Sequence, residues 1–116
     1  MATRKREVAP QDIFEIHAGY CGMFSNPARL RLVWTLGAGE RTVTSLARQL
    51  KLSVSTCSRH LAKLRDKGVV VARRQGAHLH YHVASPCFLE GCQQIRKGIL
   101  EVLRHNRLVF GTGDDS

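Results

Sequence analysis

The chain has 116 residues, the length of one domain, and 43% of them are hydrophobic. Its 18 Lys and Arg outnumber 9 Asp and Glu, which gives a formal net charge of +9. This excess favours a polyanionic partner, either nucleic acid or an anionic membrane surface, and charge alone does not choose between them. No run of about 18 apolar residues is present, which excludes a transmembrane helix, and the basic start lacks an apolar signal core. We therefore expect a cytoplasmic protein.

The two ends of the chain have the composition of tails. Residues 1–8 are basic and are expected to form a flexible tail, and residues 111–116 are expected to form a second one. Residues 9–110 contain no repeat and no low-complexity linker. We expect this range to fold as one domain.

Two helices are predicted in the first third of the chain. The first begins at Ala9, with proline in its first turn, because apolar residues then recur at helical spacing through Met23. The second begins after Asn26, an N-cap residue followed by proline. We expect this second helix to stop at Gly37 or Gly39.

Two further helices follow with a very brief break between them. The third is short and is expected to begin after Val43 or Thr44. Ser53 is a good N-cap for the fourth helix, and Gly68 stands where a left-handed residue is wanted at its end. The apolar positions of the fourth helix are spaced four and three apart, as a buried helical face requires. These positions are Cys57, Leu61 and Leu64.

The last third of the chain predicts a β-hairpin and a final helix. The strands are Val69–Val71 and His78–Val83, joined by a turn at Gln75-Gly76. Strict alternation in the second strand puts three histidines on one face and three apolar residues on the other. Ser85-Pro86 is a cap-then-proline signal that opens a helix with an apolar stripe. The predicted class is mainly α with a β-hairpin wing, in the order α-α-α-α-β-β-α, which is a winged helix-turn-helix.

The helix that begins after Ser53 has the two faces that a DNA recognition helix needs. Its inner face is apolar, and its outer face carries small polar and basic groups near the helix N-terminus, which itself favours phosphate. An ordinary amphipathic helix with a solvated basic face is the alternative, but the short helix before it and the hairpin after it favour DNA binding. The arginines beside the hairpin turn are expected to reach a DNA backbone or minor groove. The expected DNA contacts are Ser53, Val54, Ser55, Ser58, Arg59 and Lys63 on the helix and Arg73, Arg74 and Gln75 on the wing.

Several motifs together resemble the ArsR/SmtB family of bacterial repressors. They are Asn26-Pro27-x-Arg29-Leu30, Leu46-Ala47, Leu52-Ser53-x-Ser55-x-x-Ser58-x-His60-Leu61, Gly68-Val69-Val70 and Arg73-Arg74-x-Gly76. The resemblance covers about residues 10–105. It implies that residues 9–110 form a DNA-binding and dimerisation domain, with a homodimer built by the first and last helices. It also implies binding to double-stranded DNA at an inverted-repeat operator, and release by an inducer that is often a metal ion.

The metal and persulfide sensors of that family do not transfer to this sequence. Thr42-Val43-Thr44 stands where soft-metal sensors carry Cys-Val-Cys, and Trp34 stands where persulfide sensors carry a cysteine. The last helix has only Glu101 and His105 near its end, without the upstream pair that a zinc or nickel site needs. The cofactor is therefore left unknown.

The cysteines leave a thiol-based sensor open as an alternative. Cys21, Cys87 and Cys92 could bind a thiophilic metal or metalloid, or respond to redox change, although packing is the favoured role and Cys57 is expected to be purely structural. Structural disulfides are not expected in the reducing cytoplasm. Solvated histidines on the wing are favoured over a metal chelate on its second strand.

A winged-helix module for protein–protein contact is the other alternative class. Such a module would expose aliphatic or aromatic residues on the outer face of the fourth helix, where Val54 is the only apolar candidate. An enzyme is not expected, because the sequence has no glycine-rich phosphate loop, no H-E-x-x-H motif and no nucleophile elbow.

Overall fold

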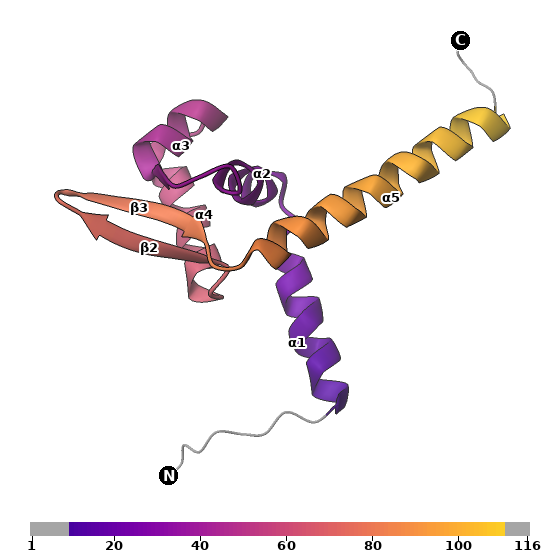
Figure 1. Cartoon of the computed structure of the whole chain (residues 1–116), viewed down its shortest axis with the longest axis horizontal. Helices are drawn as coiled ribbons and strands as arrows, with labels where there is room; N and C mark the ends of the chain where they lie inside the picture. The colour runs from indigo at the N-terminus through magenta and orange to yellow at the C-terminus, as the bar shows by residue number, and fades with distance from the viewer. Residues whose placement is uncertain (1–9, 111–116) are drawn as a thin grey trace. The chain divides into compact units, whose positions relative to one another are not determined.

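The computed structural model describes residues 10–110, and side chains between positions 12 and 107. The predicted tails at 1–8 and 111–116 lie outside the described residues. The elements follow the predicted order with one short strand added: α1, α2, β1, α3, α4, β2, β3 and α5 (Figure 1). The chain divides into two compact units, one ending at Ala84 and the other beginning at Ser85. One folded domain over 9–110 stays a prediction.

The first two helices are joined by a compact turn that is capped on both sides. α1 spans Pro10–Met23 and α2 spans Pro27–Leu36. Asn26 is the N-cap of α2, as predicted, since its Oδ1 accepts a hydrogen bond from the backbone N–H of Arg29 at 3.1 Å. The Nε of Arg29 donates in turn to the carbonyl of Met23 at 2.8 Å, which satisfies an acceptor at the end of α1.

A two-residue strand, β1 (Arg41–Thr42), precedes the third helix and was not predicted. It pairs antiparallel with β3, with Thr42 opposite His80. Thr42 is also the N-cap of α3 (Val43–Leu50), because its hydroxyl accepts from the N–H of Ser45 at 3.2 Å. The predicted start after Val43 or Thr44 was therefore wrong by one or two residues. Two residues are too few to show the alternation that reveals a strand.

The wing is a hairpin longer than the sequence indicated. β2 spans Val70–Gln75 and β3 spans His78–Val83, and the sheet order is β1-β3-β2. Pairing continues to Gln75 opposite His78, so the first strand is not limited to Val69–Val71 and the turn is one residue later than predicted. The polar residues Arg73, Arg74 and Gln75 gave no strand signal, because the outer part of the wing does not pack on the core and so needs no apolar face.

The helix α4 spans Val54–Asp66, and its apolar side chains meet those of the neighbouring elements in one core. Each of the largest core side chains is less than 2% exposed. They are Leu32, Val33, Leu46, Cys57, Leu61, Leu64, Val69 and Val70. The helices α3 and α4 form the helix-turn-helix pair. Buried apolar surface thus fixes this pair to α2 and to the base of the wing.

Both helices of the pair end with the same left-handed turn. The N–H of Leu52 bonds to the carbonyl of Ala47 at 2.8 Å, and that of Val69 bonds to the carbonyl of Leu64 at 2.9 Å. These are the 6→1 bonds of a Schellman motif, whose penultimate residue takes positive φ. That residue is Gly68 at φ 78° after α4, as predicted, and Lys51 at φ 58° after α3. Lys51 occupies a conformation that usually favours glycine.

The second unit is the helix α5, Pro86–Phe110, of 25 residues and about 37 Å in length. The hydroxyl of Ser85 accepts from the N–H of Cys87 at 3.1 Å, in keeping with the predicted cap. Cys92 is buried, but large apolar side chains remain exposed over the rest of the helix. These are Ile95, Ile99, Leu100, Val102 and Leu103. No helix within residues 10–110 has the length and apolar character needed to cross a membrane.

Substituting Gly68→Ala should lower the free energy of unfolding by about 1–2 kcal/mol, because an L-residue is strained at positive φ although nothing lies within 4 Å of the added methyl. Urea denaturation measures the change. Gly22→Ala is the matched control, since the space around Gly22 in α1 is equally open and its φ is not positive. An unchanged midpoint for Gly68→Ala would contradict the strain argument.

Candidate nucleic-acid interface

The inner face of α4 is completely withdrawn from solvent. Cys57, Leu61 and Leu64 each have 0% relative exposure. Burial raises the pKa of the Cys57 thiol, because the charged thiolate is poorly solvated there. Cys57 is thus an unreactive packing residue, in agreement with the structural role expected for it.

The outer face of α4 presents the predicted contact residues to solvent. Val54 is 48% exposed. The polar and basic side chains that follow it are also exposed, and they occupy the first three turns of the helix. They are Ser55, Ser58, Arg59 and Lys63. The geometry therefore leaves this face free for a partner, and its contacts with DNA stay a prediction.

The first turn of α4 is organised by two hydroxyl groups. The Oγ of Ser53 accepts from the backbone N–H of Thr56 at 3.1 Å and lies 2.9 Å from Thr56 Oγ1, to which it donates. Thr56 Oγ1 also accepts from Nη2 of Arg59 at 3.4 Å. Ser53 thus serves as the helix cap, and Thr56, which was not predicted, orients the outward Arg59. The i, i+3 spacing on either side of Thr56 is the sequence signal for this role.

His60 faces the body of the protein from the same helix. Its Nδ1 is buried and has no hydrogen-bond partner among the described residues. Burial lowers the pKa of His60, and the positive charges of Arg29, Arg59 and Lys63 lower it further. The imidazole is therefore neutral near pH 7.

The two wing arginines lie on opposite faces of β2, because side chains alternate along a strand. Arg74 is paired in register with Leu79 and lines an open groove of about 530 Å³ that Arg65 of α4 also lines. Val70, Val71 and Ala72 give the groove an apolar wall. Only one of the two arginines therefore lies on the groove beside the recognition helix.

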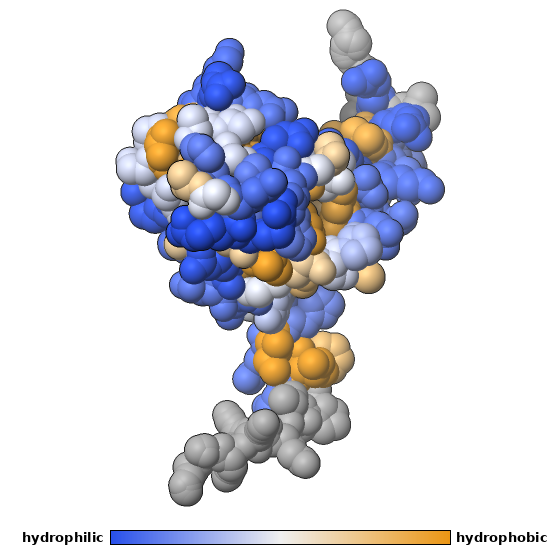
Figure 2. Space-filling model, turned by 60° about the vertical axis from the view of Figure 1, so that its left-hand side comes forward, coloured by the Kyte–Doolittle hydropathy of each residue, from blue (hydrophilic) through white to orange (hydrophobic). Residues whose placement is uncertain are grey.

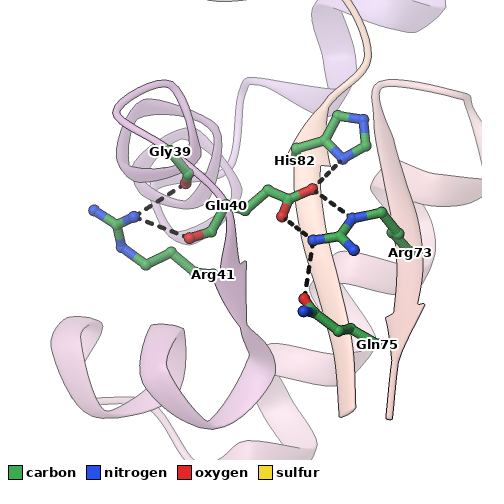
Figure 3. A network of polar contacts seen from close by, with 6 residues as sticks. All are labelled: Gly39, Glu40, Arg41, Arg73, Gln75 and His82. Atoms are coloured by element: carbon green, nitrogen blue, oxygen red, sulfur yellow. Dashed lines mark hydrogen bonds and ion pairs between the residues drawn. The ribbon is translucent and has the colours of Figure 1, made fainter.

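Arg73 is held on the other face by Glu40 (Figure 3). Its Nε donates to Oε2 of Glu40 at 3.1 Å, and its Nη2 donates to Oε1 at 2.6 Å and to Oε1 of Gln75 at 3.2 Å. His82 Nδ1 lies 3.2 Å from the same carboxylate. The hydrogen bonds from Arg73 are the main cause of a lowered pKa of Glu40, and the same bonds raise the pKa of Arg73. Glu40 was not predicted.

The thiols and histidines assemble no metal site within the described side chains. Cys21 and Cys87 are exposed, whereas Cys92 is buried like Cys57. No group of three His, Cys, Asp or Glu side chains between positions 12 and 107 could hold a metal ion. The thiol-sensor hypothesis involves cysteines of both units and stays a prediction.

The segment from Ile16 to Leu89 is strongly basic. Between Ile16 and Leu89 the chain has eleven Lys and Arg but only two acidic residues, Glu40 and Asp66. One of these two carboxylates is the partner of Arg73. A surface of this composition attracts a polyanion from a distance.

Substituting Ser53→Ala should lower the free energy of unfolding by about 1 kcal/mol, because the N–H of Thr56 loses its cap. Chemical denaturation of the DNA-free protein measures the change. Ser55→Ala is the control, since the Ser55 side chain accepts no backbone N–H in the described bonds. Equal losses for the two variants would rule out the capping role.

Acidification below about pH 6.5 should destabilise the fold in part through His60. The pKa of His60 is lower in the folded state than in the unfolded chain. The unfolded chain therefore takes up the proton first, and the free energy of unfolding decreases as the pH is lowered. His60→Gln should flatten the pH dependence of the unfolding free energy between pH 7 and 5.5, and His17→Gln controls for the substitution itself. A slope that His60→Gln leaves unchanged would show that other groups cause the effect.

Comparison with known proteins places this arrangement among transcription factors. A family model described as a helix-turn-helix domain matches residues 24–73. The HTH-type transcriptional regulator Rv0081 of Mycobacterium tuberculosis is 32% identical over 94 residues, which cover 80% of this chain and 82% of that protein. The crystal structure of Rv0081 has a TM-score of 0.76 at 31% identity and covers 84% of this chain and 97% of that chain.

Two other similar proteins extend the comparison. The nodulation protein NolR of Rhizobium meliloti is 37% identical over 76 residues, which cover 66% of this chain but only 62% of NolR. The solution structure of Mb0332 (fragment 1–100) from Mycobacterium bovis is described as a homodimeric winged helix-turn-helix DNA-binding domain of a possible ArsR-family regulator. It has a TM-score of 0.64 at 22% identity and covers 97% of this chain and 100% of that chain, which is a likeness of fold.

Rv0081 is named as an HTH-type transcriptional regulator. The 32% identity to Rv0081 over four-fifths of the chain agrees with the motif of the fourth helix and with the winged fold. The chain therefore belongs to the HTH-type transcriptional regulators, and its fold is the winged helix-turn-helix that a possible ArsR-family regulator also has.

Proposed function

We propose that the protein is a homodimeric repressor that binds an inverted-repeat operator and is released by an inducer. The observation that carries this proposal is the division of α4 into a fully buried face and an exposed face of small polar and basic residues. A rigidly anchored helix with such an outer face fits the major groove, where base edges offer hydrogen-bond partners. Blocking a promoter needs no further activity than this binding.

The residues of the outer face divide by chemistry. Ser55 and Ser58 offer hydroxyl groups to base edges, Val54 offers apolar contact to a thymine methyl, and Arg59 offers two parallel donors to guanine. Thr56 supports the last of these, since its hydroxyl accepts from the Arg59 guanidinium at 3.4 Å. Ser53 caps the helix, so we assign its DNA contact to the helix N-terminus that it helps to form.

Phosphate contacts fall to the cations beside these base-reading residues. Lys63 continues the exposed face of α4, and Arg65 and Arg74 both line the groove between that helix and the wing. A groove with two guanidinium groups and no acidic side chain in its lining suits a backbone phosphate. Gln75 at the wing tip adds an uncharged hydrogen-bonding group. These contacts would set the register of α4 on the duplex.

Dimerisation is supported by unpartnered apolar surface on both end helices. On α1, the side chains of Ile13, Phe14 and Ile16 are 51%, 73% and 42% exposed, and Figure 2 shows hydrophobic residues in orange beside the grey N-terminal segment. α5 exposes five large apolar side chains. Exposed apolar surface of this extent on a small protein marks an interaction site. A second copy of the chain would cover it, as the homodimeric description of Mb0332 suggests.

A homodimer presents two copies of α4, so its operator is expected to have two-fold symmetry with half-sites about 10 base pairs apart or a multiple of this. The bacterial chromosome lies in the cytoplasm, which is where we expect the protein to act. The inducer would act by shifting the dimer to a form that binds the operator less tightly.

The two arginines Arg59 and Arg74 provide the test, by fluorescence anisotropy with a duplex from the regulator's own promoter region and with a scrambled duplex. Wild type should prefer the promoter duplex, bind it as two chains per site, and lose affinity steeply with salt. Arg59→Ala should reduce the preference about ten-fold or more, because a bidentate base contact is lost, and should change the salt slope less. Arg74→Ala should instead reduce the slope by about 0.9 and leave the preference unchanged.

Each of these variants is the control for the other, since both remove one exposed arginine and one positive charge. Equal binding of wild type to the promoter and scrambled duplexes would contradict the proposed function. A salt slope that stays at its wild-type value in Arg74→Ala would contradict the phosphate contact alone.

A further inference from the structure

The carboxylate of Glu40 connects the two outer strands of the sheet. Glu40 immediately precedes β1, whereas Arg73 belongs to β2, and β3 lies between them in the strand order. The Glu40 side chain therefore crosses β3 to meet the guanidinium of Arg73 in a bidentate pair at 2.6 and 3.1 Å (Figure 3). His82 of β3 meets the same carboxylate on the way, at 3.2 Å. The residue before β1 is thus paired with a residue of β2, and a histidine of β3 lies beside the pair.

The backbone connection that this network reinforces is short. β1 contributes only two residues to its register with β3, opposite Tyr81 and His80. The hairpin continues beyond these pairs to its tip at Gln75 and His78, where no β1 residue accompanies it. The Glu40–Arg73 pair lies on the face of β2 opposite to Arg74, and it links the hairpin to the segment that leads into α3. It can therefore hold the wing at a fixed angle to the helix-turn-helix.

The pair also removes Arg73 from the set of free cations. Bidentate pairing uses Nε and Nη2 of Arg73, and Gln75 takes a further hydrogen bond from Nη2. A phosphate approaching Arg73 would meet the negative charge of Glu40 at the same point, so the pair offers little net attraction. In a segment with only two acidic residues, the position of one on Arg73 argues for a specific structural use.

We propose that Glu40 is a positioning residue for DNA recognition: through Arg73 it braces the wing, so that Arg74 on the opposite face lies beside α4. Arg73 then supports DNA binding without touching the DNA. The inference rests on the proposed function, because it assigns the two wing arginines of one DNA-binding surface to different tasks.

A charge exchange tests the brace, since the double variant Glu40→Arg/Arg73→Glu keeps the net charge of the protein and restores the pair in the reverse direction. Each single exchange places two like charges together, so each should lower the preference for the promoter duplex over the scrambled duplex by about five-fold or more. The double variant should recover this preference to within about two-fold of wild type. Its salt slope should equal that of wild type, because no phosphate contact is lost.

The possible outcomes separate the inference from its alternatives. If Arg73 contacts the DNA itself, the double variant will remain as impaired as Arg73→Glu and its salt slope will be reduced. If the pair has no role, Glu40→Arg will keep the wild-type preference and bind both duplexes more tightly, because its net charge is more positive by two units. Either result overturns the proposal. A wild-type protein without operator preference would instead contradict the proposed function, whatever the variants do.

A milder set of variants covers the case in which a single exchange fails to fold. Glu40→Gln and Arg73→Gln each remove one member of the pair without bringing like charges together. If the two residues act as a unit, their double variant will lose no more operator preference than either single variant. Additive losses would show that Arg73 acts independently of Glu40 and would overturn the proposal.

Discussion

The burial of one face of α4 is the constraint on which the rest of the structure depends. Three side chains spaced four and three apart, Cys57, Leu61 and Leu64, are completely removed from water. Full burial of a leucine side chain contributes on the order of 1.5–3 kcal/mol, so rotating the helix to expose this stripe would remove a large part of the stability of a small domain. The opposite face is thereby fixed outward, and its polar and basic groups need no stabilising role of their own.

The same anchoring gives the polar contacts near α4 a defined geometry. The cap at Ser53 and the left-handed Gly68 fix where the helix begins and ends relative to its buried stripe. The hydroxyl of Thr56 then limits where the Arg59 guanidinium can go. Each of these contacts is weak alone, but together they act on a helix that is already unable to rotate. Under the proposed function, these local hydrogen bonds would help to determine which base edges the helix can reach.

Much of this arrangement could be predicted from the sequence, because its strongest signals are local. The caps at Asn26 and Ser53 and the left-handed glycine depend on residues within one turn, and the helical period of α4 depends on the chain itself. The division of α4 into a buried and an exposed face was predicted for the same reason.

The contacts that could not be predicted join distant parts of the chain. The strand β1 exists because β3 supplies its partner, and Glu40 meets Arg73 across a separation of 33 residues. The local sequence around Glu40 or Arg73 contains no pattern that predicts these long-range contacts. Alternation along β2 places Arg73 and Arg74 on opposite faces, but this follows only when the strand extends to the wing tip. The polar residues near the tip gave no signal for that extension. The role of Thr56 was not predicted, although its i, i+3 spacing from Ser53 and Arg59 is present in the sequence.

The complete burial of the Cys57 sulfur provides a way to measure local opening of α4. A thiol-alkylating reagent can reach a fully covered sulfur only after the helix has opened locally, so its reaction rate reports the opening equilibrium of α4. The thiols of Cys21 and Cys87 are exposed in the single chain, so their reaction rates provide a comparison within the same molecule. The alkylation rate of Cys57 thus reports the opening of the helix that we propose to contact DNA, and bound DNA that holds α4 in place should lower this rate.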